Sequence, residues 1–293
     1  MILNVSGRTD IVAFYSDWFR NRYQEGYVDV RNPFYPKQVS RIYFEDVDAI
    51  VFCTKNPLPI IDYLEEIKKP ILFQVTLTPY GKDIEVGVPN KKDIIAGIKR
   101  ISEILGKEFL YVRYDPILLN DRYDIRYHKK MFARLCDQLE GYVEHFIVSF
   151  IDDYKNVRSH QSDLNLHPFQ KQDLEEIGKE FGSIALERNM TIQTCWEKVD
   201  FTQYGFLNEV CLSPTIAFRL TGKTNFPKWK ARNCGCVNMV DIGVYNSCLH
   251  FCKYCYANFD EKKVQQNYRE HDPHSSLLIG HLQADDIVKI RKK

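Results

Sequence analysis

The sequence predicts an α/β protein whose strands form a β/α (TIM-like) barrel, full or partial. Two patterns support this class. Short β-rich runs alternate with longer amphipathic runs, and each β-rich run is mostly apolar on both faces, which is typical of parallel strands covered by helices. A length of 293 residues suits one such barrel with insertions, so a single domain over residues 1–293 is expected.

Seven segments are predicted to be strands, and helical segments follow most of them. The strands are expected at residues 2–6, 49–54, 71–78, 109–116, 145–152, 191–195 and 239–246, with a weaker candidate at 27–31. The helices are expected at residues 9–24, 56–69, 90–105, 127–142 and 168–189, with a helix-like stretch at 206–220. Apolar residues recur at helical spacing in these runs, and Thr9 or Asp10 is suited to cap the first. Seven or eight strands favour a closed or nearly closed barrel over a doubly wound open sheet, and no G-x-G-x-x-G motif follows the first strand.

The composition is that of a folded protein with balanced charge. Hydrophobic residues make up 44% and charged residues 27% of the chain, so a sizeable core is expected. Lys and Arg number 40 against 39 Asp and Glu, so no net positive charge draws the whole protein to nucleic acid or to an acidic membrane. The N-terminus lacks signal-peptide features and no run reaches the ~20 apolar residues of a membrane span, so a cytoplasmic location is expected.

Polar residues gather where the predicted strands end, which is where barrel enzymes carry their chemistry. They are Ser6, Arg8, Asp10, Thr54, Lys55, Gln74, Thr76, Thr78, Arg113, Asp115, Ser149, Asp152, Asp153, Gln193, Glu197, Asp241 and Asn246. Solvation explains a polar strand end equally well, but Gln74, Arg113 and Gln193 lie inside strands, where a buried polar group needs a partner. Five members of the set are expected to orient cofactor and substrate: Arg8, Asp10, Lys55, Arg113 and Asp115.

Each of these five residues also has a plainer interpretation. Arg8 could hold a carboxylate or phosphate beside a helix N-terminus, or it could pair with Asp10 and brace the loop. Arg113 and Asp115 pose the same choice. Lys55 could exchange a proton only if burial lowered its pKa.

The nine cysteines are concentrated in the last third of the chain. Cys53 and Cys136 stand alone, and the other seven are Cys195, Cys211, Cys234, Cys236, Cys248, Cys252 and Cys255. An odd number of cysteines in a reducing cytoplasm argues against a disulfide framework and favours metal binding. The spacing Cys248-x3-Cys252-x2-Cys255 places three thiolates in one loop directly after a predicted strand. Three thiolates can hold three irons of a 4Fe-4S cluster and leave the fourth open to S-adenosylmethionine.

The motif C-x3-C-x2-C with an aromatic residue before the last cysteine resembles the signature of the radical S-adenosylmethionine (radical SAM) superfamily. The resemblance implies that Cys248, Cys252 and Cys255 ligate the cluster and that Tyr254 contacts the adenine. Asn246, at the end of the preceding strand, is a second expected cofactor contact. The superfamily usually carries this loop after its first strand, so its place after the last predicted strand suggests a circular permutation.

A closer resemblance covers nearly the whole chain. The segments "SGRTDI", "RNPFYPKQVSR", "DAIVFCTKNP", "RYDPI", "QTC" and "CGCVNMVDIGVYNSC" are similar to those of an uncharacterised bacterial family of unknown function, whose C-terminal cysteine cluster is similar to the radical SAM one. That family supplies no substrate, which could be a small molecule or a macromolecule. The superfamily resemblance implies an external electron donor such as flavodoxin or ferredoxin.

Other interpretations of the cysteines stay open. A structural zinc site could use His250 as a fourth ligand of the triplet, although the spacing is crowded for tetrahedral closure. Within a cysteine-rich segment at 234–258, Cys234 and Cys236 could join Cys195 and Cys211 in a second Fe-S cluster or zinc site, or Cys195 and Cys211 could be small buried hydrophobes. The protein could then be a non-catalytic electron carrier, an iron sensor, or a zinc-binding module. A nucleic-acid role, as in spore photoproduct lyase, is disfavoured by the balanced charge.

Overall fold

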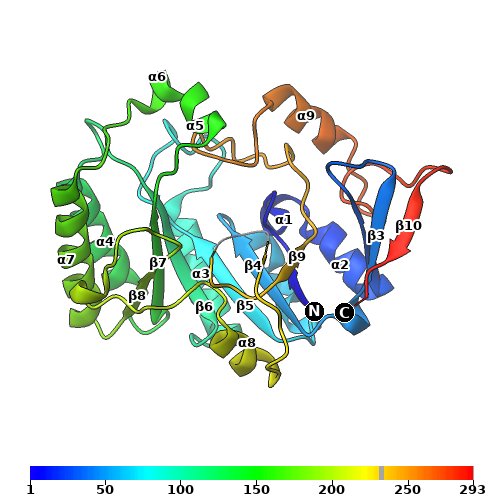
Figure 1. Cartoon of the computed structure of the whole chain (residues 1–293), viewed down its shortest axis with the longest axis horizontal. Coiled ribbons are helices and arrows are strands. Elements are labelled where there is room, and N and C mark those ends of the chain that lie inside the picture. Colours follow the sequence, from blue (N-terminus) through cyan, green and yellow to red (C-terminus); the bar gives the residue numbers. More distant parts are fainter. Residues whose placement is uncertain (231–233, 293) are drawn as a thin grey trace.

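A seven-stranded sheet forms the centre of the protein (Figure 1), which a computed structural model describes over residues 1–230 and 234–292. Its strand order is β8-β7-β6-β5-β4-β1-β9, and every neighbouring pair is parallel. The strands are β1 (Ile2–Asn4), β4 (Ala49–Thr54), β5 (Ile71–Thr76), β6 (Leu110–Ile117), β7 (His145–Phe150), β8 (Thr191–Thr194) and β9 (Met239–Asp241). All seven main predicted strands are confirmed, although β1 and β9 are shorter than expected. The fold is therefore a mixed α/β fold around a parallel sheet.

The sheet is open between β8 and β9. No strand in the described part of the chain joins these two edges, so the closed form of the predicted barrel is not found. The reason lies on one sheet face, where Ile2, Val51 and Leu72 pack against Leu212 and other residues around α8 (Pro214–Thr221). This connection fills the space that a closed barrel would enclose.

Helices cover the opposite face of the sheet. They include α1 (Ile11–Phe14), α2 (Ser16–Glu25), α3 (Lys91–Leu105), α4 (Ile125–Leu139), α7 (Lys171–Glu187) and the 3-10 helix η2 (Leu58–Glu66). Leu3, Phe52 and Phe73 point into this larger core, because alternate residues of each strand face opposite sides. The helix predicted at residues 9–24 is broken at Tyr15. The helix predicted at residues 56–69 is a shorter 3-10 helix with a proline in its first turn.

A second, three-stranded sheet lies beside the first and has the order β10-β3-β2. It contains β2 (Tyr27–Arg31), β3 (Gln38–Tyr43) and β10 (Ile287–Ile290). The weaker strand candidate at 27–31 is thus a strand, but it does not belong to the main sheet, and β3 and β10 were not predicted. The remaining helices are η1 (Phe44–Asp46), α5 (Lys155–Ser159), α6 (Gln161–Leu164), η3 (Thr202–Tyr204) and α9 (Glu261–Arg269). None of the described helices is long and apolar enough to cross a membrane.

The sheet order brings two distant parts of the chain together. β9 pairs with β1 in parallel, so that Asn4 is opposite Asp241. The loop after β1 and the cysteine loop after β9 consequently leave the same edge of the sheet. These two loops and those after β4 to β8 frame the candidate site.

Candidate functional site

The cysteine loop, residues 246–258, is closed at its base by two asparagines. The Oδ1 atom of Asn246 accepts hydrogen bonds from the backbone N–H groups of Phe259 (2.7 Å) and Asp260 (3.1 Å). The Asn258 amide donates to the carbonyl of Cys248 and accepts from the Cys248 N–H. Asn246 has a φ of 53°, a left-handed conformation that asparagine tolerates well. The side chain predicted to contact a cofactor is therefore used to close the loop.

Two neighbouring segments hold the loop from outside. Asn156, at the start of α5, donates to the carbonyls of Cys255 (3.1 Å) and Asn258 (2.9 Å). On the other side, Gly87 donates its N–H to the His250 carbonyl at 2.7 Å. A Cβ atom on Gly87 would lie 2.3 Å from the Leu249 carbonyl oxygen, so only glycine fits there. The loop is fixed by hydrogen bonds on both flanks.

The thiols of Cys248, Cys252 and Cys255 form a mutually interacting group, in which Cys248 is buried and the other two are half-buried. Burial raises the pKa of each thiol, and nearby charges on Asp10, Cys255 and Cys252 raise that of Cys248 further. Backbone N–H groups oppose this effect, since Ala257 donates to the Cys255 sulfur at 3.3 Å and the His250 N–H lowers the pKa of Cys248. A cation bound among the three groups would favour their thiolate forms against the effect of burial.

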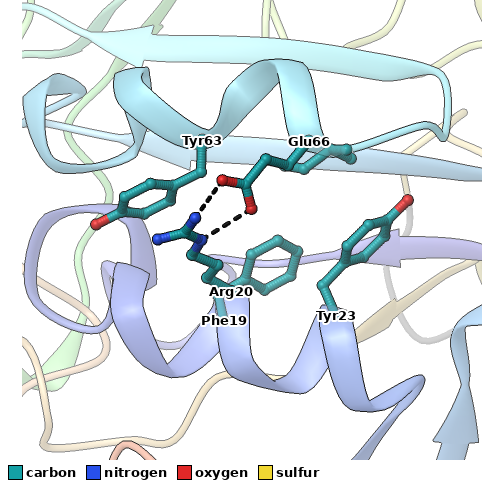
Figure 2. A pocket seen from close by; sticks show the side chains of 6 residues that line it. Phe19, Arg20, Tyr23, Tyr63 and Glu66 are labelled. Atoms are coloured by element: carbon teal, nitrogen blue, oxygen red, sulfur yellow. Dashed lines mark hydrogen bonds and ion pairs between the residues drawn. The ribbon is translucent and has the colours of Figure 1, made fainter.

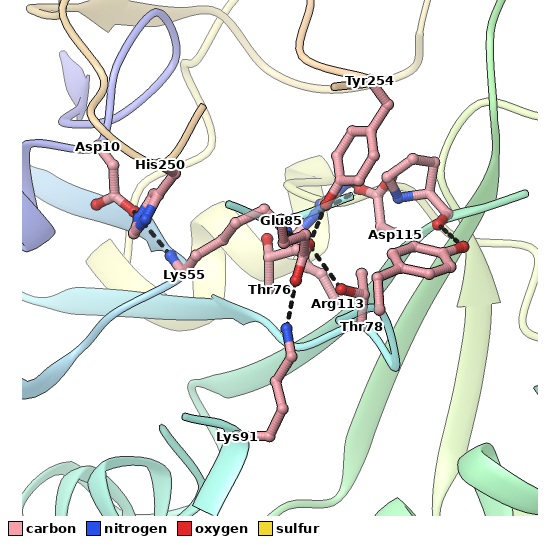
Figure 3. Close-up of polar contacts among 12 residues, drawn as sticks. Asp10, Lys55, Thr76, Thr78, Glu85, Lys91, Arg113, Asp115, His250 and Tyr254 are labelled. Carbon is pink, nitrogen blue, oxygen red and sulfur yellow. Dashed lines mark hydrogen bonds and ion pairs between the residues drawn. The ribbon is translucent and has the colours of Figure 1, made fainter. Parts of the chain in front are cut away.

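A buried ionic network lies against this loop (Figure 3). Glu85, only 1% exposed, accepts hydrogen bonds from Lys55 (2.8 Å), Thr78 (2.7 Å), Lys91 and the Tyr254 hydroxyl. Burial alone would raise the pKa of Glu85, but the two ammonium groups outweigh it and lower the pKa to about 2. Two lysines therefore face one carboxylate, which leaves an excess positive charge beside Cys252.

Lys55 was expected to exchange a proton only if burial lowered its pKa, and the pKa is not lowered. Burial would lower its pKa, but the charge on Glu85, followed by Cys252, raises it above the ordinary value. Lys55 stays protonated, and its Nζ atom lies 5.3 Å from the centroid of the Tyr254 ring. The Tyr254 ring itself packs edge to face against Tyr80. The aromatic residue of the motif is thus anchored within the network.

Asp10 and His250 pair with each other rather than with the cysteines. Asp10 Oδ2 accepts from His250 Nε2 (2.9 Å) and from the backbone N–H of Lys55 (2.8 Å), while Oδ1 caps α1 at Ala13. The other ring nitrogen of His250 lies 3.4 Å from the Gly87 carbonyl oxygen. With both ring nitrogens directed at oxygen atoms, His250 is not placed as a zinc ligand.

The loop after β1 touches the cysteine loop and carries two unpartnered hydroxyls. Tyr256 donates to the Gly7 carbonyl at 2.5 Å. Arg8 binds Asp241 through its Nε (3.3 Å) and the Asp241 carbonyl through its Nη2 (3.0 Å), so it braces β1 against β9 and does not pair with Asp10. In the described residues, Ser6 Oγ and Thr9 Oγ1 are buried without a hydrogen-bond partner. Such atoms cost stability unless a ligand or water satisfies them.

Arg113 and Asp115 form a buried ion pair at the end of β6. Arg113 Nε donates to Asp115 at 2.9 Å. Arg113 Nη1 donates to Gln74 Oε1 at 3.2 Å, so two of the polar residues inside strands, Arg113 and Gln74, bind each other. Ser149 also donates to Asp115. Burial opposes the charge on Arg113, but Asp115 raises the pKa of the guanidinium well above its usual range. The nearby Glu197, whose pKa burial raises to about 7, accepts from the Phe150 N–H.

The second cysteine group also comes together. Cys195 follows β8, and its sulfur lies 3.1 Å from that of Cys211. Cys236 interacts with Cys211, and Cys234 interacts with Cys236. Cys211 lies in a turn before α8, which begins only at Pro214, so the helical stretch predicted to contain Cys211 is wrong.

Neither cysteine group is arranged around a single metal ion. Among residues 1–230 and 234–292, no three Cys, His, Asp or Glu side chains are placed to hold one. This finding argues against zinc at the triplet and leaves the second predicted metal site unsupported. A 4Fe-4S cluster makes a different demand, because its cysteines bind separate irons and do not converge on one point. The three thiols, the N–H donors on sulfur and the excess positive charge fit an anionic cluster.

A hollow between α2 and η2 offers no ligand site (Figure 2). Its volume is only about 10 Å³, which is room for one water. Arg20 and Glu66 bridge it with a two-pronged ion pair. Neither residue belongs to the cysteine loop or to the Glu85 network.

Several residues of the site were not predicted from the sequence. Glu85, Lys91, Asn156 and Asn258 all contact the cysteine loop or its network. Asn258 carried one usable signal, because one asparagine lies on each side of the cysteine motif, Asn246 before it and Asn258 after it. Glu85 and Lys91 belong to no motif in the sequence, so no pattern marked them as site residues.

Comparison with known proteins confirms the closer resemblance, to a family of unknown function. The family described as Domain of unknown function (DUF1848) matches residues 2–257, and the chain belongs to this family. No curated protein and no solved structure matches the chain.

Proposed function

We propose that this member of the DUF1848 family binds a 4Fe-4S cluster through Cys248, Cys252 and Cys255 and acts as a radical SAM-type enzyme. One observation carries the proposal: a buried thiol and two half-buried ones share one hydrogen-bonded loop at the carboxyl edge of a parallel sheet, and His250, the expected fourth ligand of a zinc site, is paired with Asp10. When bound, the cluster and S-adenosylmethionine would supply a 5'-deoxyadenosyl radical for hydrogen abstraction from substrate.

The charges around the loop support a cluster. Lys55 and Lys91 outnumber Glu85 by one positive charge in a setting where charges are weakly screened. Three thiolates on an iron-sulfur core form an anionic group that this excess would balance. The N–H group of Ala257, directed at the Cys255 sulfur, would favour the thiolate as well.

The strand order supports a partial barrel that is permuted in sequence. β9 is the edge strand of the parallel sheet and lies beside β1, and the cysteine loop follows β9. The order of the strands along the chain would then differ from the usual radical SAM arrangement, whereas the strands that lie side by side would be the same.

The loop after β1 is the proposed contact for S-adenosylmethionine. Ser6 Oγ and Thr9 Oγ1 are buried and unpartnered in the described residues, and the Gly7 carbonyl is tied to Tyr256 beside the cysteines. A polar ligand held there would satisfy both hydroxyls. Tyr254 would offer the edge of its ring to the adenine while its hydroxyl stays on Glu85.

Arg113 and Asp115 would orient the substrate. The pair sits where β6 leaves the sheet, and Glu197 beside it titrates near neutral pH, so it could hold or release a proton. The substrate itself is not specified by these groups.

We further propose a reducing, cytoplasmic setting with an external electron donor such as flavodoxin or ferredoxin. All nine cysteines are free thiols, which such a compartment would preserve. Balanced charge gives no support to a nucleic-acid partner.

A cleavage assay tests the proposal. Anaerobically reconstituted protein, reduced with dithionite and given S-adenosylmethionine, should release 5'-deoxyadenosine and methionine. Cys252→Ala should abolish this release, whereas Cys136→Ala, which removes an isolated buried thiol on α4, should retain it. A bound cluster without any 5'-deoxyadenosine would instead indicate an electron carrier or iron sensor.

A further inference from the structure

Four thiols outside the proposed cluster site meet on the sheet face covered by α8. Cys195 is anchored by its N–H to the Val148 carbonyl (2.8 Å), and the Cys211 carbonyl accepts from the Gln74 amide (3.4 Å). Their sulfurs lie 3.1 Å apart although the residues are 16 positions apart in sequence. Two independently anchored segments thus bring one pair of thiols into direct contact.

The chemistry of this pair differs from that of metal ligands. No third Cys, His, Asp or Glu in the described ranges completes a metal site around the two sulfurs. A disulfide requires a sulfur separation of about 2.05 Å, so the pair needs to close by only about 1 Å. Arg113 Nη1 lies 3.4 Å from the Cys211 sulfur and donates to it. The contact with Cys195 lowers the pKa of Cys211, but the contact with Cys236 and burial raise it overall, and the Arg113 charge partly opposes that rise. The thiolate, which is the form that attacks disulfides, would therefore have a cationic partner when it forms.

We propose that Cys195 and Cys211 form a redox-active dithiol that exchanges with small-molecule disulfides such as oxidised glutathione. The Cys211 thiolate attacks one glutathione sulfur, and the first glutathione leaves as its thiolate. The Cys195 thiolate then attacks the Cys211 sulfur of the mixed disulfide and displaces the second glutathione. One protein disulfide forms, oxidised glutathione is reduced to two glutathione molecules, and the two thiol protons pass to the released thiolates.

The redox state of this pair would act on the candidate site through Arg113. In the reduced protein the guanidinium is shared among Asp115, Gln74 and the Cys211 sulfur. A disulfide would draw the Cys211 sulfur about 1 Å closer to Cys195 and remove its ability to become a thiolate, so oxidation would weaken its contact with Arg113. The ion pair at the end of β6 would thereby respond to the thiol balance of the cell.

Mass spectrometry of the full chain in glutathione buffers tests the proposal. The protein is equilibrated anaerobically at several ratios of oxidised to reduced glutathione, quenched in acid, alkylated and digested with trypsin. Cleavage after Lys198 separates Cys195, in residues 189–198, from Cys211, in residues 199–219. The linked peptide pair should appear reversibly, and its ratio to the reduced pair should rise about tenfold for each tenfold rise in [GSSG]/[GSH]².

The same digest contains its own control. Cys136, buried and isolated on α4, should remain fully alkylated in every buffer. Cys195→Ser should stop the reaction at a glutathione adduct on Cys211, and if that variant does not fold, the wild-type titration still decides. Linkage of Cys211 to Cys236, or alkylation of Cys195 that does not change across the series, would overturn the proposal. So would one zinc per chain that protects both thiols. The titration does not depend on 5'-deoxyadenosine formation, so it can fail or succeed separately from the proposed enzyme activity.

Discussion

At Glu85, charges from three separate parts of the chain meet away from solvent. Lys55 follows β4, Lys91 begins α3, and Tyr254 belongs to the cysteine motif. An uncompensated buried charge is costly, so removing the carboxylate leaves two ammonium groups facing each other. Glu85 therefore stabilises the fold and at the same time fixes the charge beside Cys252.

Glu85→Gln should lower the free energy of unfolding at pH 7 by about 3 kcal/mol or more. The pKa of Glu85 in the folded protein, about 2, is below its ordinary value. Its ionised form therefore stabilises the fold above about pH 4.3, and this contribution is lost as the pH falls toward 2. Urea unfolding between pH 7 and pH 2.5 should show the difference between variant and wild type shrinking across that window.

The matched control is Glu103→Gln, which removes an exposed partner of Arg100 on α3. Its effect at pH 7 should be small, because exposed ion pairs contribute little. Equal losses in the two variants, or a Glu85→Gln loss that stays constant with pH, would contradict the role given to Glu85.

At the scale of elements, the cysteine loop is rigid because its neighbours complete its backbone hydrogen bonds. Asn246 and Asn258 close it from within, and Asn156 and the segment before α3 hold it from outside. A loop held in this way can present three thiols without reorganising, which favours cluster binding.

Asn258→Ala should reduce the iron bound after reconstitution by more than half and speed its loss to a chelator. The variant removes both hydrogen bonds to the Cys248 backbone, so the first cysteine is no longer fixed. Asp173→Ala is the control, since it removes the capping-box hydrogen bond of α7 and costs about 1 kcal/mol without touching the loop. If the two variants retained iron equally well, the closing role of Asn258 would be rejected.

The helical layer depends on an aromatic contact between α4 and α7. Phe132 is fully buried and stacks on Phe181 with ring centroids 4.1 Å apart. Phe132→Ala should lower the free energy of unfolding by about 3–5 kcal/mol. Leu186→Ala, at a position on α7 that is 76% exposed, should change it by less than about 0.5 kcal/mol. Chemical denaturation of both variants checks the contrast.

The elements that the sequence predicted well are those with a local signal. β4 agrees residue for residue with its predicted range because its run is apolar on both faces. β10 is exposed along its whole length and pairs with β3, some 250 residues earlier, so no local pattern marks it. The 3-10 geometry of η2 follows a proline in its first turn, which periodicity alone did not reveal.

For the whole molecule, the decisive feature is the order of the strands. The position of the triplet on the carboxyl side of the last strand was predictable, although β9 ends at Asp241 and Cys248 follows only seven residues later. The partner of Arg8 was not predictable, because Asp241 reaches it only through the pairing of β1 with β9. Local sequence patterns also could not predict that the sheet stays open, because this depends on how the segment around α8 packs against one face of the sheet.

The iron and sulfide content of anaerobically purified, reconstituted protein tests the central claim most directly. Three cysteine ligands on one 4Fe-4S cluster predict about four irons and four sulfides per chain, with an absorption band near ~400 nm that Cys248→Ala abolishes and Cys136→Ala retains. One or two zinc ions per chain, without sulfide, would contradict the account and leave a parallel α/β protein with structural metal.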